Sequence, residues 1–204
     1  MTTQGKVTVD LSVSLDGFSA GLGQSEDRPF GADGGDGWGS KLHAWAEDAE
    51  EMRLQLEMLG QTKAFIMGRN MFGPVRGEWD RPWNGWWGDN PPYHGPVFVL
   101  THHAREPQVM EGGTTFYFVT DGIESAFKQA REAADGGNIS IHGGATTVNQ
   151  YLAAGLIDEL RLRIVPITLG AGTRLFDGVG QLDLEQVESR DAGSFMHVTY
   201  RVLS

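Results

Sequence analysis

Short apolar runs that each end in a glycine-rich or polar turn constrain the fold of this 204-residue chain most strongly. Apolar and polar residues alternate from Lys6 to Val13, which predicts a strand. Four further runs, 64–67, 97–100, 115–119 and 138–142, are too short for helices and predict buried strands. Continuous apolar strands of this kind are typical of a parallel sheet that is covered on both faces.

Segments whose apolar residues have helical spacing lie between these runs. Apolar residues recur at steps of three and four over Leu42–Leu59, which predicts one helix with Ser40 as its N-cap and Gly60 as its end. The segment Asp121–Glu124 has the spacing of a capping box and predicts the start of a second helix. A third helix is expected over 145–155.

Apolar and polar residues alternate again near the end of the chain. The segment 160–164 has one apolar and one polar face, and 182–190 and 195–202 have the pattern of two strands joined by a turn. We therefore expect one α/β domain over residues 1–204. Its predicted form is a three-layer sandwich with a mixed, mostly parallel central sheet, antiparallel C-terminal strands and helices on both faces.

Charge and cysteine content narrow the classes of function. Sixteen basic and twenty-seven acidic residues leave a formal net charge of −11, which argues against a nucleic-acid-binding protein. The chain has no cysteine, so disulfides, thiolate zinc sites and cysteine nucleophiles are excluded, and we expect no metal site. No apolar run is long enough to span a membrane, and the first residues lack the pattern of a secretion signal. We therefore expect a soluble, cytoplasmic protein.

Three segments follow predicted strands and are expected to meet at one edge of the sheet. They are Gly68–Asn70, Thr101–Arg105 and Gly143–Thr147. Ligands of open α/β sheets bind beyond the carboxyl ends of the strands. Two glycines at a strand–helix junction let a phosphate approach the backbone, where first-turn N–H groups and the hydroxyls of Thr146 and Thr147 would bind it. The alternative is a tight turn in which the glycines serve only the backbone geometry.

Basic side chains gather in two of these segments although the protein is acidic. Arg69, His102, His103 and Arg105 would suit a phosphate ester such as the adenosine 2′-phosphate of NADPH. The alternative is that they are hydrated surface side chains. The two histidines are adjacent and therefore diverge, so they do not form a metal pair.

Acidic residues matter because reduction of a C=N or C=O bond requires a proton as well as a hydride. If 42–59 is one helix, Asp48 lies on the same side as Trp45 and Met52, where apolar surroundings would favour a bound proton. Glu51 is the next candidate for this catalytic role. The alternative for Asp48 is an exposed acid that stabilises the helix dipole.

Two long segments lack a regular pattern. Residues 16–40 are rich in glycine, aspartate and serine, which is typical of a functional or mobile loop. Residues 79–87 contain four tryptophans, which favour a pocket wall or a subunit contact.

Taken together, the motifs resemble those of the dihydrofolate-reductase-like superfamily. More closely, they resemble the C-terminal reductase domain of the bifunctional riboflavin-biosynthesis deaminase–reductases, in particular its stand-alone members. The segments that carry this resemblance are SLDGFSAG (14–21), MGRNMF (67–72), VLTHH (99–103), IHGGATTVNQYL (141–152) and LIDELRLRIVPITLGAGTRLF (156–176). The resemblance extends over nearly the whole chain, from Lys6 to Val202.

The resemblance implies an NADPH-dependent reductase, usually a homodimer, of a small heterocycle such as a phosphoribosylaminopyrimidine or dihydrofolate. It implies that Gly68-Arg69 and Thr101-His102 hold the adenosine phosphate end of NADPH. The residues implied to hold the pyrophosphate are Gly143, Gly144, Ala145, Thr146 and Thr147, and those implied to border the nicotinamide are Leu15, Asp16 and Gly17. Two alternatives remain open: a reductase of another heterocycle, and a non-catalytic nucleotide- or ligand-binding module on the same fold.

Overall fold

The structure, a computed structural model, describes residues 4–33, 40–74 and 76–203. Its strands are β1 (Val7–Ser14), β2 (Phe18–Ala20), β3 (Thr62–Gly68), β4 (Pro96–Leu100), β5 (Gln108–Val109), β6 (Thr115–Val119), β7 (Asn138–His142), β8 (Glu159–Val165), β9 (Thr173–Arg174), β10 (Asp183–Asp191) and β11 (Met196–Leu203). Within the described residues, nine of them form one sheet in the order β10-β11-β8-β1-β7-β3-β4-β6-β5. The other two, β2 and β9, pair with each other.

The predicted mixture of parallel and antiparallel pairing is confirmed. Strands β8, β1, β7, β3, β4 and β6 are parallel neighbours in that order. The hairpin of β10 and β11 adds to β8 in antiparallel fashion, as expected for the last strands of the chain. The two-residue strand β5 also pairs antiparallel, at the opposite edge.

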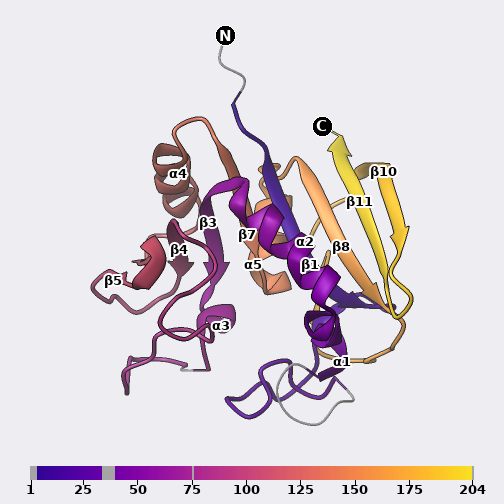
Figure 1. The fold of residues 1–204 in the computed structure, drawn as a ribbon, viewed down its shortest axis with the longest axis horizontal. Coiled ribbons are helices and arrows are strands. Elements are labelled where there is room, and N and C mark those ends of the chain that lie inside the picture. Colours follow the sequence, from indigo (N-terminus) through magenta and orange to yellow (C-terminus); the bar gives the residue numbers. More distant parts are fainter. Residues whose placement is uncertain (1–3, 34–39, 75, 204) are drawn as a thin grey trace.

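Helices cover both faces of the sheet, which confirms the predicted α/β class (Figure 1). The α-helices are α1 (Ser40–His43), α2 (Ala49–Gly60), α3 (Arg69–Phe72), α4 (Ile123–Ala134) and α5 (Ala145–Ala153). Two short 3₁₀ turns, η1 (Ala44–Glu47) and η2 (Glu111–Gly113), complete the described helical segments. Neighbouring side chains of β3 enter different cores, because a strand alternates its faces. Ala64 and Ile66 pack with α4 and α5, whereas Phe65 and Met67 pack with α2 and α3.

The predicted single helix over 42–59 is wrong. The chain forms α1 and η1, adopts an extended backbone at Asp48 (ψ 121°), and then begins α2. The side chain of Asp48 accepts hydrogen bonds from the backbone N–H groups of Glu50 and Glu51, so Asp48 is the N-cap of α2. The proposed cap at Ser40 concerns a side chain outside the described residues.

The predicted capping box at Asp121 is also wrong. The N-cap of α4 is Gly122, which has no side chain to bond the first turn. The predicted loop over 16–40 contains one regular element, since β2 pairs with β9, and its residues 34–39 lie outside the described part of the chain.

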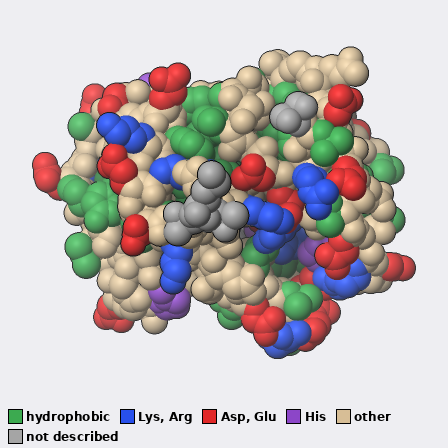
Figure 2. All heavy atoms as spheres, turned by 90° about the horizontal axis from the view of Figure 1, so that it is seen from above, with side chains coloured by type: hydrophobic (Ala, Val, Ile, Leu, Met, Phe, Trp, Pro, Cys, Tyr) green, Lys and Arg blue, Asp and Glu red, His purple; other side chains and the backbone are tan. Residues whose placement is uncertain are grey.

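The surface around the N-terminal end of β1 carries acidic and basic side chains that are interspersed with small apolar areas (Figure 2). Within the ranges that the structure describes, no helix is both long and apolar enough to cross a bilayer.

Candidate functional site

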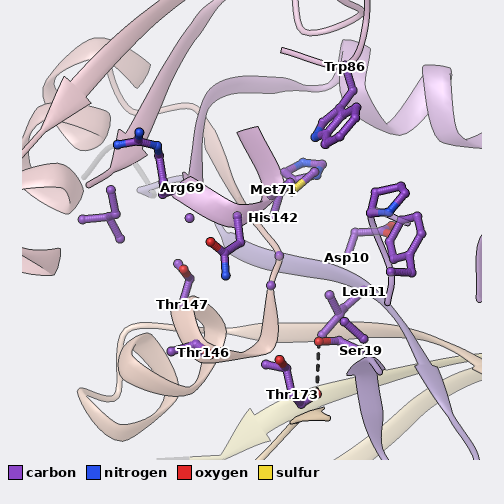
Figure 3. A pocket seen from close by; sticks show the side chains of 18 of the residues that line it. Asp10, Leu11, Ser19, Arg69, Met71, Trp86, His142, Thr146, Thr147 and Thr173 are labelled. Atoms are coloured by element: carbon purple, nitrogen blue, oxygen red, sulfur yellow. Dashed lines mark hydrogen bonds between the residues drawn. The ribbon is translucent and has the colours of Figure 1, made fainter. Parts of the chain in front are cut away.

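A cavity of about 910 Å³ opens at the carboxyl edge of the parallel strands. The adjacent strands β7, β3 and β4 end at this edge and deliver Gly143-Gly144, Gly68-Arg69 and Thr101 to its wall. The expectation that these three segments meet at one edge is therefore confirmed. Figure 3 shows Arg69 and Asp10 at opposite ends of the cavity, with His142 between them.

The turn from β7 into α5 is tied closely to its neighbours. The backbone N–H of Gly68 donates to the carbonyl of Gly143 at 3.1 Å. In the first turn of α5, the N–H of Ala145 donates to Ser19 Oγ at 3.2 Å and that of Thr147 donates to the carbonyl of Gly144 at 3.0 Å. The predicted set of first-turn donors is therefore partly used within the protein. The side chain of Thr146 is exposed at the cavity wall.

Gly68 and Gly144 differ in the room that their surroundings leave for a side chain. A Cβ at Gly68 would lie 2.3 Å from Thr147 Oγ1, so a side chain there would force the Thr147 hydroxyl to move. A Cβ at Gly144 would meet no atom within 4 Å, and its φ of −79° is open to any residue. Neither packing nor φ therefore requires glycine at 144. The space beside Gly144 is an open part of the cavity wall.

Arg69 is held at one end of the cavity. Its guanidinium donates to Thr101 Oγ1 at 2.7 Å and to the carbonyl of Gly77 at 3.1 Å, and it lies 3.3 Å from the centre of the Trp79 ring. Arg105 lies 4.9 Å from the centre of the same ring. Loss of hydration lowers the pKa of Arg69, and the positive charges of Arg76 and Arg105 add to this, while Asp80 and Glu78 oppose it.

The other predicted basic residues are placed differently. His102 and His103 line the cavity, and His103 pairs with Glu78 at 3.0 Å. Arg105 is not among the described residues that line it, because its guanidinium turns to the carbonyl of Trp83 at 2.7 Å. The predicted role of the tryptophan segment as a pocket wall is confirmed for Trp86 and Trp87.

The far end of the cavity contains an ion pair that sequence reasoning missed. Asp10 of β1 accepts a hydrogen bond from Arg163 of β8, which also donates to Gln55 of α2. The Arg163 guanidinium lies 4.0 Å from the centre of the Trp45 ring, whose Nε1 donates to Ser12 Oγ at 3.0 Å. All five residues line the cavity.

Two neutral histidines stand in the same wall. Loss of hydration lowers the pKa of His43 to about 4, assisted by the nearby charge of Arg163. Burial lowers the pKa of His142 to about 4 as well. His43 stacks on Phe30 with ring centres 4.3 Å apart, and Tyr93 meets His142 edge-on at 5.8 Å. This end of the cavity is therefore aromatic and carries no histidine charge at neutral pH.

The predicted placement of Asp48 at the buried side of a helix is wrong. Asp48 is exposed and does not line the cavity, because the helix break turns its carboxylate to the first turn of α2. Glu51 is buried but is also not a cavity-lining residue. Its carboxylate pairs with Arg190 at 2.8 Å and with His197 at 2.7 Å, which joins α2 to the β10–β11 hairpin.

In the segment after β1, the carboxylate of Asp16 is hydrogen-bonded within the protein. Asp16 accepts hydrogen bonds from Ser14 Oγ and from the backbone N–H groups of Leu169 and Gly170, and these bonds lower its pKa to about 2. Leu15, Asp16, Gly17 and Ala145 are not among the described residues that line the cavity. Ser19, two residues beyond Gly17, does line it, and Figure 3 shows its bond to the carbonyl of Thr173.

Comparisons with known proteins support the resemblance of the sequence. The uncharacterized protein YyaP of Bacillus subtilis (strain 168) is 26% identical over 196 residues, which cover 94% of this chain and 91% of that protein. The structure of RibD from Acinetobacter baumannii matches with a TM-score of 0.64 and 15% identity, covering 100% of this chain and 59% of the other. Dihydrofolate reductase from Enterococcus faecalis, complexed with NADP(H), matches with a TM-score of 0.56 and 16% identity over 100% of both chains.

At these low identities, the two structural matches establish the fold alone, which is the dihydrofolate-reductase-like fold that the motifs resemble. Membership of a family rests on the sequence. A profile of the RibD C-terminal domain matches residues 5–198, nearly the whole chain. This protein therefore belongs to the RibD C-terminal domain family.

Proposed function

We propose that this protein is an NADPH-dependent reductase of a small heterocyclic substrate. The observation that carries the proposal is one continuous cavity with two unlike ends. One end combines the Gly143-Gly144 turn, threonine hydroxyls and Arg69, whereas the other is lined by aromatic rings around a buried ion pair. Such a division suits a phosphorylated cofactor beside a planar substrate.

The first end fits the phosphates of NADPH. The open space at Gly144 admits a group close to the backbone, where Thr146 offers a hydroxyl. Arg69 and Arg105 share the Trp79 ring, and their mutual repulsion would be relieved by a phosphate dianion. The same clustering favours the 2′-phosphate that distinguishes NADPH from NADH.

When bound, NADPH supplies a hydride, and the chain's own residues orient the partners and exclude water. Trp86, Trp87 and Tyr93 line the cavity and would shield a planar ring from solvent. Asp10 is the only acidic residue among the described residues that line the cavity, so it replaces Asp48 and Glu51 as the acid nearest to a bound substrate.

Two titrations followed by a screen test this function. NADPH and NADH are titrated with the protein's tryptophan fluorescence as the signal, and NADPH is expected to bind roughly tenfold to a hundredfold more tightly. Dihydrofolate and the phosphoribosylaminopyrimidine of riboflavin biosynthesis are then screened for oxidation of NADPH, with other heterocycles after them. Lack of NADPH binding would refute the proposal.

A non-catalytic binding module is the second candidate. It is favoured by one observation, namely that both acids predicted to help catalysis point away from the cavity. Tight NADPH binding without turnover of any heterocycle in the screen would support this candidate over the reductase.

A further inference from the structure

Tyr93 carries a hydroxyl group that has no bonding role in the fold. The residue is buried, with an exposed fraction of 5%, and its Oη has no hydrogen-bond partner within the described residues. Some unpaired polar atoms of the described part are sealed from any open space, as His142 Nε2 is, but Tyr93 Oη is not one of them. Oη therefore retains contact with open space, and the open space that Tyr93 lines is the cavity. Buried polar groups are normally satisfied, so an unpaired hydroxyl at a cavity indicates a ligand or an ordered water.

The surroundings of Tyr93 fix the position of this hydroxyl. The Tyr93 ring meets the Trp87 ring edge-on, with 5.1 Å between ring centres. The buried hydroxyl of Thr114 accepts a hydrogen bond from the backbone N–H of His94 at 3.0 Å and donates to the carbonyl of Pro91 at 3.1 Å. These bonds hold the chain on both sides of Tyr93. Phenylalanine has the same shape apart from the hydroxyl, so packing alone does not require tyrosine here.

Tyr93 lies where the two ends of the cavity meet. Its ring meets the His142 ring edge-on, with 5.8 Å between ring centres. His142 directly precedes the Gly143-Gly144 turn at the cofactor end, and in the sheet it is the register partner of Asp10 at the other end. A cofactor bound at the turn and a substrate bound at the aromatic end would therefore meet beside Tyr93.

The other titratable groups on the aromatic side of the turn are not suited to give a proton. Asp10 accepts a hydrogen bond from Arg163 as one half of an ion pair, so it has no proton to give. Loss of hydration lowers the pKa of His43 and of His142 to about 4, so neither carries an acidic proton at neutral pH. Tyr93 is the only tyrosine among the described residues that line the cavity. Burial raises the pKa of its hydroxyl, which therefore keeps its proton until a strong base forms beside it.

We propose that the Tyr93 hydroxyl is the catalytic proton donor of this cavity and that it hydrogen-bonds the heteroatom of the C=O or C=N bond that is reduced. As the hydride adds to the carbon, the electron pair of the double bond moves to the heteroatom, which takes the proton of Tyr93 Oη. The phenolate then regains a proton from water. The transfer is favourable because the alkoxide or amide anion that would otherwise form is a much stronger base than a phenolate. This inference rests on the proposed function and supplies the proton donor that Asp48 and Glu51 do not provide.

The stability of ligand-free variants tests whether the hydroxyl serves the fold. Tyr93→Phe removes an unpaired buried hydroxyl, so its melting temperature should equal or exceed that of the wild type. Tyr151→Phe is the matched control: Tyr151 is also buried and is not among the described residues that line the cavity, but its hydroxyl donates to the carbonyl of Ile123 at 3.0 Å. Its melting temperature should fall. A lower melting temperature in Tyr93→Phe would mean that the hydroxyl is bonded within the protein and would overturn the inference.

Hydride transfer tests the catalytic role. The compound that the wild type reduces in the screen is mixed with NADPH and each variant in a single-turnover experiment. Tyr93→Phe is expected to transfer the hydride roughly a hundredfold to ten-thousandfold more slowly and to bind NADPH as the wild type does. Tyr151→Phe should react at the wild-type rate.

Fluorine labelling gives a readout that does not depend on turnover. The chain has four tyrosines, so protein labelled with 3-fluorotyrosine carries four fluorine signals, and Tyr93→Phe identifies the signal of Tyr93. In the complex with NADP⁺, which has no hydride to transfer, the same compound is expected to move the Tyr93 signal and to leave that of Tyr151 in place.

The outcomes distinguish this inference from the proposed function. Absence of NADPH binding, or of turnover with every heterocycle, would overturn the proposed function and this inference with it. Normal turnover in Tyr93→Phe, or a Tyr93 fluorine signal that does not respond to a compound that the wild type reduces, would overturn this inference alone. A loss of NADPH affinity in Tyr93→Phe would assign the hydroxyl to the cofactor and would overturn it as well.

Discussion

At the scale of one residue, Arg69 of the Met67-Gly68-Arg69 motif is held in position to bind an anion at the cavity edge. It begins α3 directly after β3, so the parallel sheet brings it to the cavity edge. Thr101 and the Trp79 ring then fix the orientation of its guanidinium. An arginine held in this way loses little rotamer freedom when it binds an anion.

Arg69→Ala is expected to weaken NADPH binding by roughly tenfold to a hundredfold and to leave NADH binding nearly unchanged, because only NADPH has the 2′-phosphate. Fluorescence titration with both cofactors measures this. Arg53→Ala is the control, since Arg53 is an exposed arginine that pairs with Glu50 and Glu57 on α2. Equal losses for NADPH and NADH would remove Arg69 from the 2′-phosphate site.

Asp48, in contrast to Arg69, has a structural role and not the catalytic role that the sequence suggested. As the N-cap of α2 it is expected to affect stability and not rate. Asp48→Ala should lower the free energy of unfolding by about 1 kcal/mol, whereas Asp48→Asn keeps a capping oxygen and should change it little. Urea unfolding measures the first effect, and NADPH affinity should stay at the wild-type value in both variants. A loss of turnover in Asp48→Asn, once a substrate is known, would contradict this assignment.

At the scale of elements, the sequence pattern predicts the parallel strands but not the helix break at Asp48. Apolar runs identified the core strands because their side chains are buried on both faces. The periodic spacing of Leu42, Trp45 and Leu59 continued across the break and concealed it, since all three side chains are buried. A signal was nonetheless present: an aspartate followed three residues later by a glutamate, as in Asp48 and Glu51, is typical of a helix start.

The contact of α2 with the C-terminal hairpin predicts a dependence of stability on pH. Hydrogen bonds from Arg190, together with His197, lower the pKa of Glu51 from its ordinary value of 4.5 to about 2. Because the folded state lowers this pKa, the stabilisation is complete above pH 4.5 and is lost as pH falls toward 2. Glu51→Gln should therefore be less stable than the wild type at neutral pH, and the difference should shrink over that acidic range.

Urea unfolding at a series of pH values measures this difference. Glu57→Gln is the control, because Glu57 also pairs with an arginine but is exposed, and exposed pairs contribute little. A stability difference for Glu51→Gln that is independent of pH would contradict the role of its charge.

At the scale of the whole molecule, the sequence predicted one end of the cavity better than the other. The carboxyl ends of parallel strands meet at one edge whatever the strand order, so Gly143-Gly144, Gly68-Arg69 and Thr101 could be grouped from their motifs. The pairing of Asp10 with Arg163 depends on β8 lying next to β1, which the pattern of apolar residues does not reveal. Asp10 occupies a polar position of an alternating strand, where a charged residue gives no sign of its partner.

The family resemblance also predicts the state of assembly. We expect a homodimer, with a mass in sedimentation equilibrium of twice the 22.3 kDa of one chain. The edge strand β10 is exposed along nearly its whole length and carries Leu184 and Val187 on the surface, which offers a second copy a strand edge and apolar side chains. A mass of one chain at micromolar concentration would contradict the expectation.

The affinity of NADPH for the wild-type protein and for Gly144→Val tests the central claim most directly. Gly144 has open space around its Cβ position, so valine meets no packing clash there while it occupies the place of the cofactor phosphates. Valine is a poorer N-cap of α5 than glycine, so the variant should lose about 1 kcal/mol of stability and remain folded. Gly180→Val is the control, because a Cβ there also meets nothing within 4 Å and Gly180 lines no described cavity. We predict that the wild type and Gly180→Val bind NADPH alike and that folded Gly144→Val binds it at least about a hundredfold more weakly. Wild-type affinity in folded Gly144→Val would contradict the account.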